Sequence, residues 1–448
     1  MGRYVDVKKE QQDTGYGSRR YSIGGVYHPY IPDKLSELTF TPDESTAVAL
    51  ADATEVVSRV DEYIKANRTT GVLSILSKSE SIASSLMEDI GSSTHNIIFA
   101  LDVDDIRNDT IRSIIKNINL TDETIGRFGD TAQPITVSDI IELQAGLVQY
   151  TSQGTIRGTE FAGIKTAQNR IGGNSLFDAT FIPTPPQYMD EYLNDLVTYI
   201  NHHGHTNPIV AAAFVHAQFE TLHPFPDGNG RTGRAIIQGM LRRDGVVRYS
   251  VFPISTVLKE RADDYIGGLN SFRYDGLPQP NLINNWIKTF SYALADAAEL
   301  AKVATDQIIE LRADWRTRLS DVRSDAVDHH VVDYVLENLS AHSGSLAKRF
   351  GVSQETARNS LKRLEELGIL ESRNRERRRV FYAPAAIDII DSVEVKFRPA
   401  TTQSKSVPSI DVKTTQKAPR LLRCGCDMPN SRVRCNLRLG HPGHHQHK

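Results

Sequence analysis

Cysteine is scarce in this chain of 448 residues: three occur, and all of them lie between Cys424 and Cys435. This distribution excludes a disulfide framework for most of the chain and favours a reducing compartment. No apolar run approaches the ~20 residues that a membrane helix needs, and the first residues lack the apolar core of a signal peptide. We therefore expect a cytoplasmic protein with no membrane partner.

An excess of charge of one sign is also missing. The 52 Lys and Arg residues stand against 55 Asp and Glu residues, which gives a net charge of −3, so no global charge favours nucleic acid or an acidic partner. The apolar share of 39% and the charged share of 24% are ordinary for a globular protein. At this length the chain should form two to four folded units.

Periodicity divides the first part of the chain into three segments. Residues 1–45 are polar with no sustained period and predict an irregular arm. Apolar residues at spacings of three and four predict a helical region over 46–145, with one helix from Lys78 to Ile90. Residues 146–312 form the main domain, in which further helices are expected at about 257–269 and 282–311.

Two local patterns lead into the middle of the main domain. Glycines and alternating residues between about Gly154 and Phe181 predict a short β-hairpin, which the prolines from Pro183 onward end. Asn207 suits the N-cap and Pro208 the first position of a helix. That helix runs into a glycine-rich loop that begins at His223.

The loop reads His-Pro-Phe-Pro-Asp-Gly-Asn-Gly-Arg-Thr-Gly-Arg. Gly228 and Gly230 flank Asn229, so the backbone N–H groups can turn inward as an anion-binding nest at the start of a helix. Arg231 and Arg234 are three residues apart and project from one face of that helix. Two guanidinium groups beside a nest suit a polyphosphate.

Two further side chains of the loop supply chemistry. Asp227 stands at the start of the nest, where a carboxylate suits Mg²⁺ that phosphates already bridge. His223 is able to be neutral at pH 7 and to take a proton from a hydroxyl group. The alternative is a glycine turn beside a solvated arginine pair. The presence of His223, Asp227 and both arginines favours a nucleotide-phosphate site.

The same run resembles the core motif of the Fic-domain family, His-Pro-Phe-x-Asp/Glu-Gly-Asn-Gly-Arg-x-x-Arg, at every fixed position. The resemblance extends from about Gly163 to Trp286. It implies a mostly α fold whose hairpin, the flap, aligns a target side chain by strand-like pairing. It also implies Mg²⁺-dependent transfer of AMP from ATP to a Ser, Thr or Tyr hydroxyl of another protein or of the chain itself.

The resemblance implies a role for each residue of the loop. His223 would be the general base, and Asp227 would ligate Mg²⁺ between the α- and β-phosphates. Arg231 would hold the outer phosphates and Arg234 the γ-phosphate. The α-phosphate would be held by Gly228, Asn229 and Gly230.

Three residues outside the loop are assigned in the same way. Gly172 and Gly173 would lie in or beside the flap. Tyr265 matches a tyrosine that family members often place near the adenine, although a helical tyrosine is more often part of a core.

The family also has an inhibitory helix with the pattern Ser/Thr-x-x-x-Glu-Gly/Asn. Ser84 and Glu88 match this pattern N-terminal to the core, whereas Asp89 does not. The resemblance implies that Glu88 pairs with Arg234 and blocks the γ-phosphate; the alternative is a glutamate that faces solvent on an amphipathic helix. In related proteins the same glutamate assists removal of AMP by positioning a water, so the reverse reaction stays open.

Residues 326–395 predict a winged helix-turn-helix, in which Gly351 makes the turn and Ser353 caps the next helix. The wing would span residues 371–382. Between Lys348 and Arg379 there are ten basic and five acidic residues, which favours contact with DNA phosphates. Such units also serve as protein–protein or homodimer modules, and both interpretations stay open.

The end of the chain divides into a linker and a tail. Residues 396–423 are rich in Thr, Ser, Gln, Lys and Pro, which is typical of a linker. Residues 424–448 carry Cys426, Cys435, His441 and His444, which predict a ligand set for a small structural Zn²⁺ knuckle. Which of Cys424 and Cys426 would ligate, and which histidine would complete the set, stays open. The alternative is a flexible histidine-rich tail.

Three hypotheses about function follow from these motifs. The first is an AMP-transferring enzyme, restrained by Glu88, that uses Mg²⁺ and ATP. The second is a DNA-binding regulator whose Fic core senses nucleotide or acts on itself. The third keeps the enzyme with phosphate or phosphocholine as the transferred group; because the loop is unaltered, AMP is favoured. The target protein is not identified by the sequence.

Overall fold

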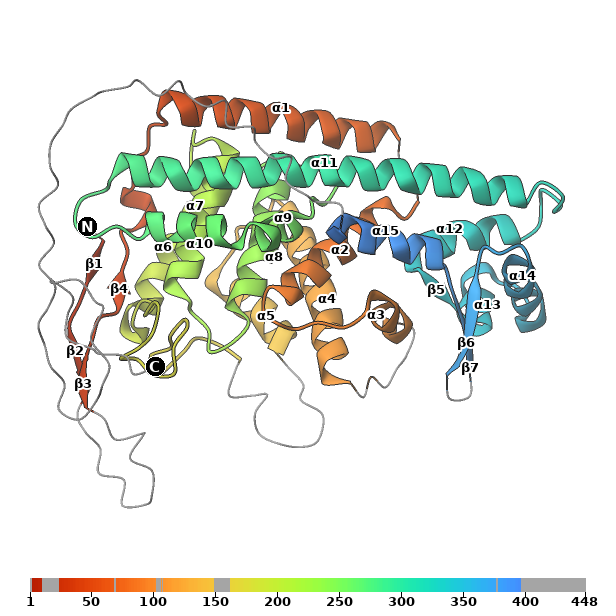
Figure 1. Ribbon diagram of the computed structural model, residues 1–448, viewed down its shortest axis with the longest axis horizontal. Helices are drawn as coiled ribbons and strands as arrows, with labels where there is room; N and C mark the ends of the chain where they lie inside the picture. The colour runs from red at the N-terminus through yellow and green to blue at the C-terminus, as the bar shows by residue number, and fades with distance from the viewer. Residues whose placement is uncertain are drawn as a thin grey trace, which may run out of the picture. The chain divides into compact units, whose positions relative to one another are not determined.

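The computed structural model describes residues 2–9, 24–67, 70–101, 106, 108–148, 162–375 and 378–395. These residues are mainly helical (Figure 1), and they all belong to one compact unit that spans residues 1–398. The linker and the cysteine- and histidine-rich tail proposed for 396–448 lie outside the described residues, as do Cys426, Cys435, His441 and His444.

The N-terminal arm contains short paired strands. The four strands are β1 (Arg3–Tyr4), β2 (Val7–Lys9), β3 (Gly25–Tyr27) and β4 (Tyr30–Ile31). β1 pairs with β4 and β2 with β3, both antiparallel, and the 3₁₀ turn η1 (Leu35–Glu37) follows. The irregular arm expected here was therefore wrong in part, because strands of two or three residues are too short to show an alternating pattern.

Two long helices lie side by side along the upper edge of Figure 1. They are α1 (Glu44–Ala66) and α11 (Pro280–Arg318). α1 begins at Asp43, whose carboxylate accepts the N–H of Thr46, as an N-cap does. α11 was expected over 282–311 and extends further at its C-terminal end, toward the last part of the described chain.

Below them lie α2 (Val72–Leu86), α3 (Thr94–Leu101), α4 (Asp109–Gly129) and α5 (Val137–Val148). The sequence placed one helix over 78–90, but α2 begins earlier and ends at Leu86. The N–H of Asp89 donates to the carbonyl of Leu86 and the N–H of Ile90 to that of Ser85, which is the Schellman pattern of a helix end. Glu88 therefore stands just beyond the helix, at its C-terminal turn.

The main domain is built on the helices that flank the glycine-rich loop. They are η3 (Pro186–Tyr188), α6 (Met189–His202), α7 (Pro208–Leu222), α8 (Asn229–Arg243), α9 (Ile254–Glu260) and α10 (Ala262–Phe272). The cap at Asn207 is confirmed, since its side chain accepts the N–H groups of Ile209 and Val210. α7 is buried from Ile209 to Leu222, so it is a central helix with no solvent face.

The single helix expected over 257–269 was wrong. The backbone breaks at Arg261, with φ −111° and ψ 43°, between α9 and α10. A break of one residue leaves the apolar spacing on either side almost unchanged, so periodicity does not reveal it.

The hairpin predicted before the prolines is present as one antiparallel bridge between Ile171 and Phe181. Gly172 and Gly173 begin the connection between these two residues with φ of 67° and 66°, a conformation that glycine adopts without steric cost. The earlier part of the expected hairpin, at 154–161, lies outside the described residues.

The C-terminal part contains helices and strands, of which the first short strand and the last helix were not expected. These elements are α12 (Asp328–Asn338), β5 (Ser340–Ala341), α13 (Ser343–Phe350), α14 (Gln354–Glu366), β6 (Glu371–Arg375), β7 (Arg378–Tyr382) and α15 (Pro384–Val395). The strands form a sheet of order β5-β7-β6. Ser353 caps α14 by accepting the N–H of Thr356, whereas α15 was not foreseen.

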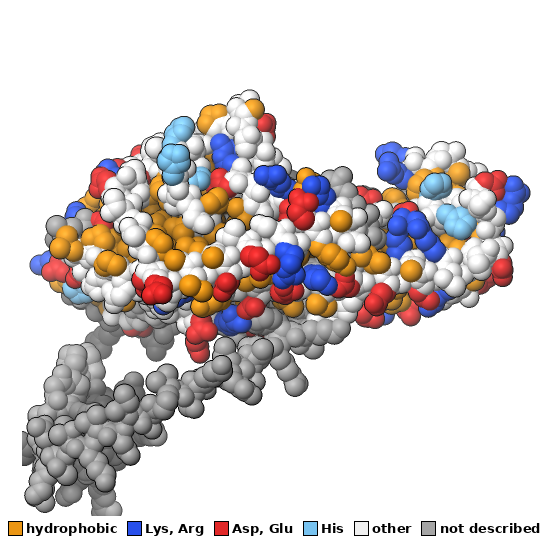
Figure 2. Space-filling model, turned by 90° about the horizontal axis from the view of Figure 1, so that it is seen from above, with side chains coloured by type: hydrophobic (Ala, Val, Ile, Leu, Met, Phe, Trp, Pro, Cys, Tyr) orange, Lys and Arg blue, Asp and Glu red, His pale blue; other side chains and the backbone are white. Residues whose placement is uncertain are grey.

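The surface matches the nearly balanced charge of the sequence. On the face shown in Figure 2, acidic and basic side chains are interspersed. Within the described ranges no helix combines the length and the apolar character that crossing a membrane requires.

Candidate functional site

Two helix ends shape the glycine-rich loop. His223 ends α7 in the left-handed region, with φ 48° and ψ 59°, and Gly228 begins α8 with φ 80°. Between them the side chain of Asn229 accepts the N–H of Phe225 at 2.9 Å and donates to its carbonyl at 2.8 Å. The loop is therefore held closed by its own asparagine, and no side chain caps the first N–H groups of α8.

A cavity of about 710 Å³ opens over this loop. Its wall includes His223, the run from Asp227 to Gly230, and Arg234, together with Glu88 beyond α2 and Tyr265 on α10. Ile171, Thr180 and Phe181 of the hairpin form another part of the wall. The structure thus brings most of the sequence-predicted site residues to one cavity; Ser84, Arg231, Gly172 and Gly173 are not in its wall.

Arg234 is held by the end of α2. Its guanidinium donates to the hydroxyl of Ser84 at 2.9 Å and to the carbonyl of Ser84 at 2.8 Å. It also pairs with the carboxylate of Glu88 at 2.8 Å, and its side chain is only 3% exposed. Burial alone would lower the pKa of Arg234, but the nearby Glu88, Tyr265 and Glu220 raise it, so the guanidinium stays charged.

Glu88 lies over the nest. A β-carbon added to Gly230 would collide with the Oε1 atom of Glu88 and would come within 2.9 Å of the Nη1 atom of Arg234. The glutamate therefore occupies the space directly above the glycine of the loop and pairs with the arginine that follows. Its side chain is 38% exposed, so this ion pair is open to solvent on one side.

Arg231 points to a different neighbour. Its guanidinium donates to the hydroxyl of Ser113 on α4 at 2.7 Å and lies 3.9 Å from the carboxylate of Asp227. Burial lowers the pKa of Arg231. Although Arg231 and Arg234 are one turn apart on α8, the first is directed toward α4 and the second toward α2.

The donor set at Asp227 fits a magnesium ion that arrives with a nucleotide. The Asp227 side chain is 57% exposed, and one of its oxygens accepts the N–H of Gly228 at 2.8 Å. Mg²⁺ needs only one or two protein carboxylates when phosphates supply its other ligands. No group of three potential metal-ligating side chains occurs among the described residues, so a metal held by protein ligands alone is not indicated there.

Glu220 is a site residue that the sequence analysis missed. It lies one turn before His223 on α7, and its Oε2 atom is 3.7 Å from the Nδ1 atom of His223. Burial raises the pKa of Glu220, but His223, His216 and Arg234 outweigh burial and lower it to about 2. A glutamate three residues before the histidine of the loop was the only signal in the sequence.

Lys165 and Asn169 form a second missed feature. Lys165 donates through Nζ to the carbonyl of Leu222 at 2.9 Å and through its backbone N–H to that of Pro224 at 2.8 Å. Asn169 donates to the carbonyls of His223 and Phe225 at 2.9 and 3.0 Å. The segment that precedes the hairpin therefore fixes the backbone on which His223 stands.

Tyr265 is buried beneath the cavity. Its hydroxyl lies 2.9 Å from the Nε2 atom of His216, and the two rings stack with centroids 5.9 Å apart. Burial lowers the pKa of His216 to about 4, so this imidazole is neutral at pH 7. Tyr265 is thus both a core residue and part of the cavity wall.

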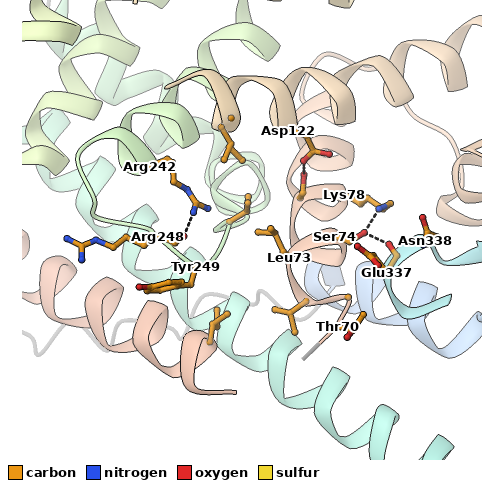
Figure 3. Close-up of a pocket in the computed structure, with 17 residues that line it drawn as sticks. Thr70, Leu73, Ser74, Lys78, Asp122, Arg242, Arg248, Tyr249, Glu337 and Asn338 are labelled. Carbon is orange, nitrogen blue, oxygen red and sulfur yellow. Dashed lines mark hydrogen bonds between the residues drawn. The ribbon is translucent and has the colours of Figure 1, made fainter. Parts of the chain in front are cut away.

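A larger cavity of about 950 Å³ lies away from the loop (Figure 3). Its wall joins the start of α2, including Ser74 and Lys78, to Arg242 of α8 and to Glu337 of α12. None of the sequence-predicted site residues lines it. At the edge of this cavity the hydroxyl of Ser74 donates to the carbonyl of Glu337, and this hydrogen bond connects α2 to α12.

Comparison with known proteins identifies the domain that carries the loop. Residues 134–241 match the Fic/DOC family, so this chain carries a Fic domain. A protein adenylyltransferase fic-1 of Caenorhabditis elegans is 29% identical over 141 residues, which are 31% of this chain and 25% of that protein. A probable protein adenylyltransferase of Aquifex aeolicus is 32% identical over 72 residues, or 16% of this chain and 22% of that protein.

The matches to these curated relatives span about a quarter of the relatives' own length. A crystal structure of a Fic family protein from Desulfovibrio desulfuricans has a TM-score of 0.47 and 20% sequence identity, and covers 77% of this chain and 97% of that chain.

Proposed function

We propose that this protein is an adenylyltransferase, which transfers AMP from ATP to a Ser, Thr or Tyr hydroxyl of a target protein or of itself. One observation carries the proposal: an unaltered loop from His223 to Arg234 lines one cavity together with the hairpin. The names of the curated relatives support it. These relatives match over only part of their length, so their activity is proposed, and not established, for this chain.

The proposed reaction is a displacement at the α-phosphorus. His223 takes the proton of the target hydroxyl, and the hydroxyl oxygen forms a bond to the α-phosphorus. The bond from that phosphorus to the bridging oxygen breaks, and pyrophosphate leaves. The N–H groups at Gly228, Asn229 and Gly230 stabilise the charge that builds on the α-phosphate. Asp227 would hold a Mg²⁺ ion, which would supply positive charge beside the phosphates.

The proposed resting state is inhibited by Glu88. Its carboxylate takes the place over Gly230 and holds Arg234, so a γ-phosphate would meet a negative charge in place of a free guanidinium. Removal of AMP, with the same carboxylate orienting a water, is the reverse activity that the proposal keeps open.

A second candidate function concerns residues 326–395, for which we infer a winged helix and contact with DNA. Arg358 and Lys362 are exposed on α14, and Arg373 is exposed on β6. Arg379, in contrast, pairs with Glu365 at 2.7 Å. A mobility shift of double-stranded DNA that Arg358→Glu abolishes supports this role; its absence at low salt contradicts it.

The test of the enzyme uses ATP labelled at the α- or the γ-phosphate, with the full chain and a cell lysate as the source of targets. Label should enter protein from α-labelled ATP only, should increase with Glu88→Gly, and should vanish with His223→Ala or with EDTA. His202→Ala, at an exposed histidine at the end of α6, is the matched control and should leave the labelling unchanged.

Each alternative has its own outcome in the same assay. Equal label from γ-labelled ATP would contradict AMP transfer. Unchanged labelling with Glu88→Gly would contradict the inhibitory role and leave the reaction intact. Loss of label from prelabelled target that depends on Glu88 would show the removal activity.

A further inference from the structure

The imidazole of His223 faces a carboxylate on its own helix. Glu220 and His223 are three residues apart, so both project from the same side of α7. The Nδ1 atom of His223 lies 3.7 Å from the Oε2 atom of Glu220, and the two side chains are 20% and 8% exposed. The AMP transfer proposed above assigns no role to the carboxylate of Glu220.

Both side chains hold buried polar atoms that lack a hydrogen-bond partner among the described residues. They are the Nδ1 atom of His223 and the Oε1 atom of Glu220. A buried carboxylate costs free energy unless it is paired. The Nδ1 atom of His223 faces the other carboxylate oxygen, Oε2, so a small movement of either side chain would complete a hydrogen bond between them.

The neighbouring helix leaves room for the carboxylate. A β-carbon added to Gly233 of α8 would collide with the Oε1 atom of Glu220. The glycine at this position therefore permits the charged group to stand between α7 and α8. An apolar side chain at position 220 would fill this space without burying a charge. The stability of the fold therefore does not by itself explain a glutamate there.

Groups on three elements face Glu220. Against the effect of burial, its pKa is lowered by His223 and His216 of α7 and by Arg234 of α8. Tyr265 of α10 stays neutral, because burial and the nearby Glu220 raise its pKa. Beyond α10, Arg273 donates to the backbone carbonyl of Glu220 at 3.3 Å and covers the ring of Phe181 in the hairpin at 3.8 Å.

We propose that Glu220 is a positioning residue that accepts a hydrogen bond from Nδ1–H of His223 and leaves Nε2 free to take the target proton. The proposal rests on the transfer function proposed above. The carboxylate fixes the tautomer and the ring orientation, and it stabilises the imidazolium that forms when the proton arrives. At 3.7 Å the contact is longer than a hydrogen bond; such contacts tighten when substrates bind.

The kinetic test uses Glu220→Gln in the Glu88→Gly background of the full chain. Removing the charge should lower kcat at least about tenfold, while KM for ATP stays within about twofold. The acid limb of kcat/KM should move to lower pH by roughly one unit, because His223 loses the anion that favours its protonated form. Glu220→Asp keeps the charge and should recover part of kcat. Unchanged kcat and an unchanged acid limb in Glu220→Gln would overturn the proposal.

A second measurement separates this proposal from the transfer function. In the full chain, NMR titration of the ring nitrogens should show His223 protonated at Nδ1, and its titration should move to lower pH in Glu220→Gln. Asp244→Asn is the matched control: Asp244 lies 3.3 Å from the Nε2 atom of His203, so this variant should shift His203 and leave His223 unchanged.

The two measurements distinguish the possible failures. Absence of AMP transfer in Glu88→Gly, together with a shifted His223 titration in Glu220→Gln, would remove the proposed function and keep the pair. Transfer in Glu88→Gly with a His223 titration that Glu220→Gln leaves unmoved would keep the function and overturn the pair.

Discussion

Asp89 and His223 share a backbone conformation that is uncommon for residues with a side chain. Their φ angles are 57° and 48°, and each follows a helix that ends near the cavity over the glycine-rich loop. The left-handed region costs an L-residue energy, less for Asp than for most. Residues held there depend on the surrounding hydrogen bonds, which here are the Schellman bonds at Ile90 and the contacts of Asn169.

The family pattern has Gly or Asn at the position of Asp89, and both suit the left-handed region. Asp also tolerates this conformation, which is why it is able to stand here. Gly at the same position meets no steric cost, so Asp89→Gly should raise the free energy of unfolding by about 0.5–1 kcal/mol. Urea unfolding measures the change. Asp89→Ala, which has neither the freedom of Gly nor a local hydrogen-bonding group, should lower stability; equal stability of the two variants would contradict this account.

At the scale of residues, the sequence located the loop because its groups are adjacent in the chain. His223, Asp227 and Arg234 lie within twelve positions, and local backbone rules connect them. Glu220, Lys165 and Asn169 were missed because a lone polar residue is most often solvated. Their burial depends on segments that only the tertiary structure brings together.

Among the elements, α2 has a special position because its two ends contact different parts of the protein. Near its middle, Glu80 is buried and accepts the N–H and the hydroxyl of Ser255 at 2.8 and 2.6 Å. These bonds tie α2 to the first turn of α9. Burial raises the pKa of Glu80 to about 7.

Glu80 should make stability depend on pH. Because its folded pKa is raised above the unfolded value of about 4.3, its contribution is complete below that value and is lost as pH rises toward 7. Glu80→Gln stays neutral, so its stability relative to wild type should increase between about pH 4.5 and 7, by on the order of 3 kcal/mol. Urea unfolding at pH 5 and pH 8 measures this difference; parallel changes in both proteins would contradict it.

Elements were predictable where a cap or a clear period marks them. Asn207 and Ser353 marked the starts of α7 and α14, and Gly351 marked the turn between α13 and α14 with φ of 66°. The end of α2 was misplaced because Ile90 continues the apolar spacing after the helix has turned back. The break at Arg261 and the strands before Tyr30 leave too little periodic signal to detect.

Across the described part of the chain, α12 contacts the start of α2, the helix after which Glu88 follows; Ser74 of α2 and Glu337 of α12 lie beside each other in Figure 3. Gly71, the N-cap of α2, has φ 93°, and a β-carbon there would lie 2.5 Å from the carbonyl oxygen of Leu336. Ser74 donates to Glu337 beside it. The C-terminal elements and Glu88, which we propose to be inhibitory, are thus joined through one helix of about 22 Å.

Gly71→Ala should separate α2 from α12. The substitution combines an unfavourable φ with a backbone collision, so it should lower the free energy of unfolding by about 1–3 kcal/mol. If α2 transmits the displacement to Glu88, labelling from α-labelled ATP should increase over wild type. Gly146→Ala, at a helical glycine with open space around it, is the control and should stabilise the protein by about 0.5–1 kcal/mol with unchanged labelling. Destabilisation by Gly71→Ala without increased labelling would show that the contact between α2 and α12 stabilises the fold but does not affect Glu88.

The position of the Glu88 carboxylate over Gly230 also has a genetic consequence. Under the proposed function, most changes at codon 88 release an enzyme that needs no further activation, so such alleles should be dominant and dose-sensitive. Suppressors should then arise inside the loop, and a codon change at His223 should mask any allele of Glu88. A population would tolerate the loss of this gene more easily than the loss of one carboxylate within it.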